Sequence, residues 1–160
     1  TKLIEDSEKI NYNKGLAYGN YFLGRVFISL LDNKKSIYYT NLSLNFLKGS
    51  KDKALESSNY MLLGACYQQL QFYNIAIQNY KKSLNVVKSE KIDAVAKQQM
   101  QSNNYFNISD TYRLQGKYDS AYVYLNKNKS LYKVLKSPNN FAEEASVYMK
   151  IGQYFTEKTR

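Results

Sequence analysis

The sequence predicts an all-α protein with the architecture of an α-α superhelix, a right-handed solenoid of antiparallel helix pairs. Apolar residues recur at separations of three, four and seven, which is the period of a helix and not of a strand. A small residue in the same apolar setting recurs at Gly24, Gly64, Ser109 and Gly152, at intervals of 40, 45 and 43 residues. Such a period indicates stacked repeats, because one helix pair alone cannot bury its apolar side.

The first helix of each unit is predicted from the residues around the small one. In the second unit Leu63 precedes Gly64, and aromatic residues stand four positions before it and three after it, at Tyr60 and Tyr67. Every copy has a large aliphatic residue, then Gly or Ser, then an aromatic residue three positions on. These spacings place the large side chains together on one side of a helix.

The second helix of each unit is built around another small residue, twelve positions after the first. Ile77, Tyr80 and Leu84 then share one face of the second helix in unit two. Because a side chain at a helix crossing holds the backbones apart, we expect Gly64 and Ala76 to face each other across the pair. The twelve-residue landmarks are Ser36, Ala76 and Ala121.

Clusters of Gly, Pro, Asn and Asp mark the links between helices. Within units, links are predicted at 71–74 and 115–119, where Gly116 ends the first helix and Asp119 caps the second. Links between units are predicted at 48–52 and 136–140.

The whole chain, 1–160, is expected to form a single array and to be a fragment of a longer protein. The chain begins with residues typical of the end of a second helix, since Ser-Glu-Lys-Ile occurs both at 7–10 and at 89–92. The expected segments are the tail of an upstream repeat at 1–13, repeat one at 14–50, repeat two at 51–91, repeat three at 92–137 and the first helix of repeat four at 138–160.

The repeated residues resemble the tetratricopeptide repeat. Its motif asks for an aromatic residue, Leu three positions on, Gly next, Tyr three later, Ala twelve after the Gly and an aromatic residue four beyond. Unit two carries Tyr60, Leu63, Gly64, Tyr67, Ala76 and Tyr80, and unit three carries Tyr105, Ile108, Ser109, Tyr112, Ala121 and Leu125. The match is weaker in unit one, and unit four supplies only its first half.

The resemblance implies a scaffold that binds a protein or peptide in a concave groove lined by the first helices. The period here exceeds the family's usual ~34 residues. Long-period members occur in the sensor regions of bacterial signalling and transcription regulators, so this chain is expected to be such a sensor or interaction region.

Composition argues against an enzyme. The chain has no His and one Cys, which removes Ser-His-Asp and Cys-His catalysis and the common zinc sites. No Gly-rich phosphate loop, metal-ligand cluster or nucleophile–base pair is found in the sequence. We therefore expect no catalytic residues, no metal and no cofactor.

Several residue types have an ordinary structural interpretation. Glu143 and Glu144 fall in the first turn of a predicted helix, where acids favour the macrodipole. Cys66 is expected to be a small buried residue, and most of the 17 tyrosines are expected to lie in the core. Asp110 and Arg113 stand three apart on one helix, and either pair with each other or contact a partner.

The partner-binding residues follow from the groove positions of the resembled family. They form a mixed set of aromatic, aliphatic, amide and charged side chains, without the Lys/Asn clamp by which chaperone-binding members hold a carboxylate. The set is Tyr18, Tyr21, Arg25, Ile28, Met61, Gln68, Gln69, Asn103, Phe106, Asp110, Arg113, Met149 and Gln153.

The net charge of +10 leaves a second function open, direct binding of nucleic acid by basic helix faces. Only three of the 23 basic residues are Arg and the lysines are scattered, which favours solvated surfaces instead. Self-association through exposed terminal repeats also stays open. The sequence carries no targeting signal, and it favours the cytoplasm over the periplasm without deciding between them.

Overall fold

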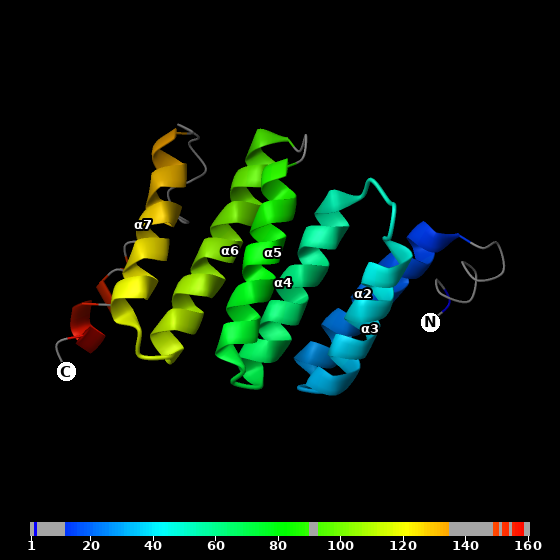
Figure 1. Ribbon diagram of the computed structural model, residues 1–160, viewed down its shortest axis with the longest axis horizontal. Helices are drawn as coiled ribbons and strands as arrows, with labels where there is room; N and C mark the ends of the chain where they lie inside the picture. Colours follow the sequence, from blue (N-terminus) through cyan, green and yellow to red (C-terminus); the bar gives the residue numbers. More distant parts are fainter. Residues whose placement is uncertain are drawn as a thin grey trace. The chain divides into compact units, whose positions relative to one another are not determined.

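In the computed structural model the described residues are 2, 12–89, 93–134, 149–150, 152–153 and 155–158, and every element among them is an α-helix (Figure 1). The all-α prediction is therefore confirmed. The chain divides into two compact units, Thr1–Ile92 and Asp93–Arg160. The first unit holds α2 (Asn13–Ser29), α3 (Asn33–Phe46), α4 (Lys53–Gln69) and α5 (Tyr73–Ser89), and the second holds α6 (Ala94–Leu114) and α7 (Tyr118–Val134).

The helices form three antiparallel pairs, α2 with α3, α4 with α5, and α6 with α7. In the first unit the pairs also pack on each other, through α3 against α4 and α2 against α4. The solenoid and the repeat boundaries stay predictions. The segments 3–11 and 136–140 and the Glu143–Glu144 pair lie outside the described residues.

In each of the three pairs, the first helix is joined to the second by the same kind of tight turn. Its middle residue has a left-handed backbone in each case, with φ of 60° at Leu31, 63° at Gln71 and 71° at Gly116. The next residue donates its N–H to the carbonyl five positions back, as Asp32 does to Phe27 at 2.9 Å. This is the Schellman arrangement, which satisfies the last carbonyls of a helix. Gly116 therefore ends α6 as predicted.

The second helices begin earlier than the sequence predicted. α5 begins at Tyr73 and α7 at Tyr118, so each link is three residues long. The prediction that Asp119 caps α7 is wrong, because Asp119 is already the second residue of that helix. Its carboxylate instead forms an ion pair with Lys158, with Nζ 2.6 Å from Oδ1.

Leu31→Gly is expected to raise the free energy of unfolding by ~1 kcal/mol, because a non-Gly residue in the left-handed region is strained by about that much. The Leu31 side chain is 75% exposed, so little packing is lost with it. Urea denaturation measures the change, with Gly116→Leu as the control of opposite sign. A loss of stability in Leu31→Gly would show that the side chain, and not the backbone, decides this position.

The small residue Gly64 makes room for a large side chain of the second helix. A Cβ placed on Gly64 would lie 2.5 Å from Cε1 of Tyr80. The Tyr80 ring therefore lies against Gly64, which the sequence did not reveal, and the predicted contact of Gly64 with Ala76 stays a prediction. Tyr80 is 1% exposed, and its hydroxyl donates to Gln68 Oε1 at 3.0 Å. The glycine is needed to make room for this ring.

Residues twelve apart form a hydrogen bond between the two helices in the first and third pairs. Ser36 Oγ donates to the Gly24 carbonyl at 2.8 Å, and Ser109 Oγ donates to the Ala121 carbonyl at 3.0 Å. The serine is on the second helix in one pair and on the first helix in the other. Because each serine hydroxyl donates a hydrogen bond to a buried backbone carbonyl, burying this polar side chain at the helix contact costs little folding free energy.

The second pair docks on the first through α4. A Cβ on Gly24 would lie 3.1 Å from Leu62 Cδ2, and Cys66 Sγ donates to Ser36 Oγ at 3.0 Å. Cys66 is fully buried, as predicted, and this burial raises the pKa of its thiol. Tyr18 is bonded to the start of α4, where its hydroxyl donates to Asp52 Oδ2 at 3.0 Å.

Most described tyrosines are half-buried and not core residues, which corrects the sequence analysis. Tyr80 is the one fully buried tyrosine in the described part of the chain. Others form ring contacts at the edge of the core, such as Tyr112 with Tyr124 at 5.7 Å between centroids. The core at the start of α2 is aliphatic, with Ala17, Leu47 and Leu55 at its centre.

Candidate partner-binding surface

Four of the predicted groove residues lie along α2. Arg25 is exposed, and its guanidinium carbon lies 5.9 Å from the centroid of the Tyr21 ring. Tyr21 packs with its other side against the core at the start of α2, and Ile28 is half-buried. Tyr18 is held by Asp52, and both burial and that carboxylate raise the pKa of its hydroxyl. Of these four residues, Tyr21 and Arg25 are therefore the ones that a partner could contact most readily.

The predicted groove residues of α4 also differ in whether they are exposed or engaged within the protein. Gln69 is exposed and Met61 is half-buried. Gln68 accepts the hydroxyl proton of Tyr80, so its amide helps to fix the ring that fills the space at Gly64. Gln68 thus has a structural role that the sequence did not indicate.

In the second unit, Asp110 and Arg113 form the ion pair that the sequence left open. Arg113 Nη2 lies 2.9 Å from Asp110 Oδ1, and its Nη1 lies 3.4 Å from Glu157 Oε1. The hydrogen bonds that Arg113 donates to the Asp110 carboxylate raise the pKa of the guanidinium. All three side chains stay about one-third exposed, so these pairs contribute ~0–1 kcal/mol each. A partner can still reach them.

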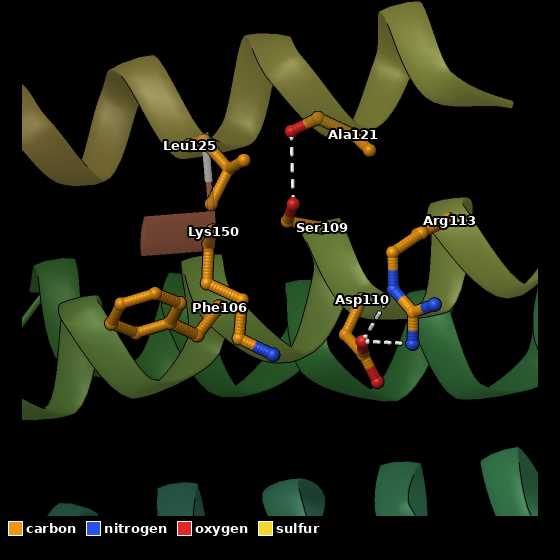
Figure 2. Close-up of a pocket in the computed structure, with 7 residues that line it drawn as sticks. All are labelled: Phe106, Ser109, Asp110, Arg113, Ala121, Leu125 and Lys150. Atoms are coloured by element: carbon orange, nitrogen blue, oxygen red, sulfur yellow. Dashed lines mark hydrogen bonds and ion pairs between the residues drawn. The ribbon is translucent and has the colours of Figure 1, made fainter. Parts of the chain in front are cut away.

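Phe106, Asp110 and Arg113 come together on one side of α6 (Figure 2). Together with residues of α7 they line a hollow of about 20 Å³, which has room for about one water molecule. This volume is far too small for a cofactor or a metabolite. The lining residues are Phe106, Ser109, Asp110, Arg113, Ala121, Leu125 and Lys150.

Lys150 lines this hollow from a sequence position that corresponds to Leu62 in the first unit. Each stands two residues before a glycine, Gly152 or Gly64, and each enters the groove of the preceding helix pair. Figure 2 shows the Lys150 side chain running beside Phe106. The lysine stem covers apolar surface while its ammonium group must stay near water.

Lys150→Leu is expected to raise the free energy of unfolding of the second unit by ~1 kcal/mol, because leucine has no ammonium group to keep near water and can bury its whole side chain beside Phe106, where each further buried CH₂ group contributes ~0.8 kcal/mol. Thermal unfolding followed by circular dichroism measures the change. Lys117→Leu, at an exposed position in the link before α7, is the matched control and should be near neutral. Equal effects of the two substitutions would contradict the placement of Lys150 in the groove.

The described residues Phe155 and Lys158 make two more contacts with the α6/α7 pair. The Phe155 ring meets the Tyr122 ring at 5.6 Å between centroids, and Lys158 pairs with Asp119. Met149 and Gln153 are exposed. Asn103 on α6 is also exposed, and it accepts a hydrogen bond from Gln99 at 3.2 Å.

Sequence reasoning missed Lys150 and Glu157 as members of this site. A signal for Lys150 was present, since it stands at the same distance from Gly152 as the buried Leu62 from Gly64. The Glu157–Arg113 pair spans 44 residues. The spacing of residues around Glu157 gives no indication of this ion pair with Arg113.

No three His, Cys, Asp or Glu side chains in the described part of the chain come together as metal ligands. None of the described helices is both long and apolar enough to cross a membrane. No protein-family model matches the sequence, and no curated protein is similar enough to count as a relative.

Proposed function

We propose that this chain is a non-catalytic, tetratricopeptide-like scaffold that binds a protein or peptide. The observation that carries the proposal is the recurrence of one docking contact. Leu62 enters the groove of the α2/α3 pair, and Lys150 enters that of the α6/α7 pair at the same distance from its glycine. A contact repeated in register supports a stacked-repeat architecture, whose first helices usually provide the binding surface.

The residues along the first helices suit a polypeptide better than a small molecule. In the first unit the exposed or half-buried groups include Tyr21, Arg25 and Gln69, and in the second unit they include Phe106 and Arg113. Aromatic and Arg side chains commonly carry most of the energy of a protein interface. The hollow beside Phe106 has room for only about one water, so recognition on this surface would depend on contacts across an open face. A role as the sensor region of a larger bacterial regulator is part of this proposal and rests on the resemblance alone.

Photo-crosslinking tests the proposed surface directly. A photoreactive amino acid at Gln69, on α4, should give adducts with a polypeptide in an extract of the source cells. The same group at Lys81, exposed on α5, is the matched control and should give far fewer. Polypeptide adducts from Lys81 but not from Gln69 would place the binding surface on the second helices instead.

One observation favours the alternative of nucleic-acid binding. α3 and α5 together carry five lysines and no acidic residue. Two further lysine heads lie over rings of their own chain, Lys14 at 6.0 Å from the Tyr18 centroid and Lys127 at 4.5 Å from that of Tyr124. Scattered lysines of this kind attract phosphate without reading sequence.

Binding to duplex DNA is therefore expected to be weak, independent of sequence and lost by ~200 mM salt, because it depends on released counterions. Fluorescence anisotropy with two unrelated duplexes at rising salt measures it. A complex that prefers one sequence and survives at ~200 mM salt would support the alternative and oppose the protein-binding proposal.

A further inference from the structure

The first unit has a hollow of its own, between the end of α3 and the first half of α4. Its volume is about 210 Å³, which has room for several water molecules or one small organic molecule. None of the residues that line it belongs to the set predicted for partner binding. A molecule that binds here is therefore distinct from the proposed polypeptide partner.

One side of this hollow is apolar. Leu47 lines it, is 4% exposed and packs with Ala17 and Leu55 in the core at the start of α2. Leu44 and Tyr60 also line the hollow, and both are half-buried. The hollow thus reaches the edge of the core, and an aromatic ring or a short alkyl chain placed there would be removed from water.

The other side of the hollow is basic, because Lys48 and Lys53 line it. Lys82, on α5, lies beside it, with its Nζ 5.8 Å from the centroid of the Tyr60 ring. Lys53 Nζ is paired with Glu56 Oε2 at 2.7 Å. No carboxylate in the described part of the chain forms an ion pair with Lys48 or with Lys82. Two ammonium groups that no carboxylate neutralises therefore lie at one hollow.

We propose that this hollow binds a small phosphate monoester with an apolar body, such as an aryl phosphate. A phosphate monoester carries about −1.5 to −2 charge at pH 7, which matches the ammonium groups of Lys48 and Lys82. Its oxygens accept hydrogen bonds from lysine, while the ring lies against Leu44, Leu47 and Tyr60. A carboxylate brings only one charge, and inorganic phosphate has no apolar part. This inference does not depend on the proposed polypeptide binding.

Phenyl phosphate is the probe, and the readout is the amide resonance of Gly49 in NMR spectra of the isotope-labelled chain. Gly49 lines the hollow, whereas Gly116 lies in the second unit and is the internal control. At ~150 mM salt, which screens distant charges, phenyl phosphate should shift the Gly49 resonance saturably, with a Kd of ~1 mM or below. The Gly116 resonance should stay in place. Benzoate and inorganic phosphate should each bind at least about fivefold more weakly.

Two lysine variants test the basic side of the hollow. Lys48→Gln and Lys82→Gln should each weaken phenyl phosphate binding by about threefold or more, because each removes one of the charges that face the phosphate. Both residues are exposed, so the fold should be unaffected. Lys51→Gln is the matched control, since Lys51 is exposed in the same link but does not line the hollow. At ~150 mM salt its effect should stay below about 1.5-fold.

Glu56→Gln tests the site with the opposite sign. The Glu56 carboxylate lines the hollow, neutralises Lys53 and repels an entering anion. The neutral amide frees Lys53 for the phosphate, so Glu56→Gln should strengthen phenyl phosphate binding by about threefold or more. Asp32→Asn is the matched control, because it removes the acid of another pair three residues apart, with Lys35, and should leave the affinity unchanged.

Several results would overturn the proposal. One is the absence of a saturable shift at Gly49, and another is equal affinity for phenyl phosphate and inorganic phosphate. Equal losses in Lys48→Gln and Lys51→Gln, or weaker binding in Glu56→Gln, would show that scattered surface charge and not the hollow attracts the anion. Displacement of phenyl phosphate by duplex DNA at ~200 mM salt would assign these lysines to nucleic acid instead.

Discussion

Gly64→Ala is expected to lower the free energy of unfolding by ~1–3 kcal/mol, the usual range for overpacking a filled contact. The added methyl group would lie 2.5 Å from Cε1 and 2.8 Å from Cζ of Tyr80. The ring is 1% exposed and is bonded to Gln68, so it cannot turn aside without breaking that bond and opening the α4/α5 pair. Gly64→Leu should cost more, for the same reason.

Two further variants isolate the cause of this loss. Gly152→Ala has the same chemistry in a helical residue with nothing within 4 Å of the new methyl group, so it should be neutral or stabilising by up to ~1 kcal/mol. Tyr80→Leu removes the ring, and in that background Gly64→Ala should lose most of its effect. Additive effects of Gly64→Ala and Tyr80→Leu in urea denaturation would contradict the contact.

Phe106→Ala and Arg113→Ala are each expected to weaken binding of the partner by at least about fivefold, or ~1 kcal/mol. Phe106 offers an apolar ring beside a charged pair, and Arg113 is still one-third exposed while it pairs with Asp110. Titration of the captured partner against each variant measures the change. Circular dichroism should show unchanged helix content.

The control for this prediction lies on a second helix. Lys82 is exposed on α5, with its Nζ 5.8 Å from the Tyr60 ring centroid, and Lys82→Ala should leave affinity within about twofold, which corresponds to ~0.4 kcal/mol. Asp110→Asn separates packing from charge, because it keeps the shape of the side chain but removes the ion pair with Arg113. Loss of binding in Lys82→Ala with full binding in Phe106→Ala would show that the wrong helices were assigned.

The sequence predicted the helices well because their period and their glycines are local signals. The spacing of Ile77, Tyr80 and Leu84 placed one face of α5 correctly, and all three are buried. Gly116 marked the end of α6 because a left-handed residue there favours glycine. Leu31 and Gln71 take the same backbone without being glycine, so composition alone did not reveal that all three turns are alike.

The contacts between helices were harder to predict. A spacing of twelve identified the two small residues of a pair, but it did not show that the larger Tyr80 lies between the backbones at Gly64. For the binding surface, the pattern named residues on the first helices without distinguishing those engaged inside the protein. Tyr18 and Gln68 have hydrogen-bond partners within the fold, at Asp52 and Tyr80, and a partner on another helix leaves no trace in the helical period of the sequence.

The short reach of the helix contacts has a consequence for how the protein folds. The bond from Ser36 to Gly24 closes a loop of 12 residues, and that from Cys66 to Ser36 closes one of 30. Loops of this size close quickly and at small entropic cost, and chains dominated by such local contacts reach the native state in microseconds to milliseconds. Each pair can therefore form soon after its second helix leaves the ribosome. An emerging chain of this kind exposes its apolar faces only briefly, which reduces the time available for aggregation during synthesis.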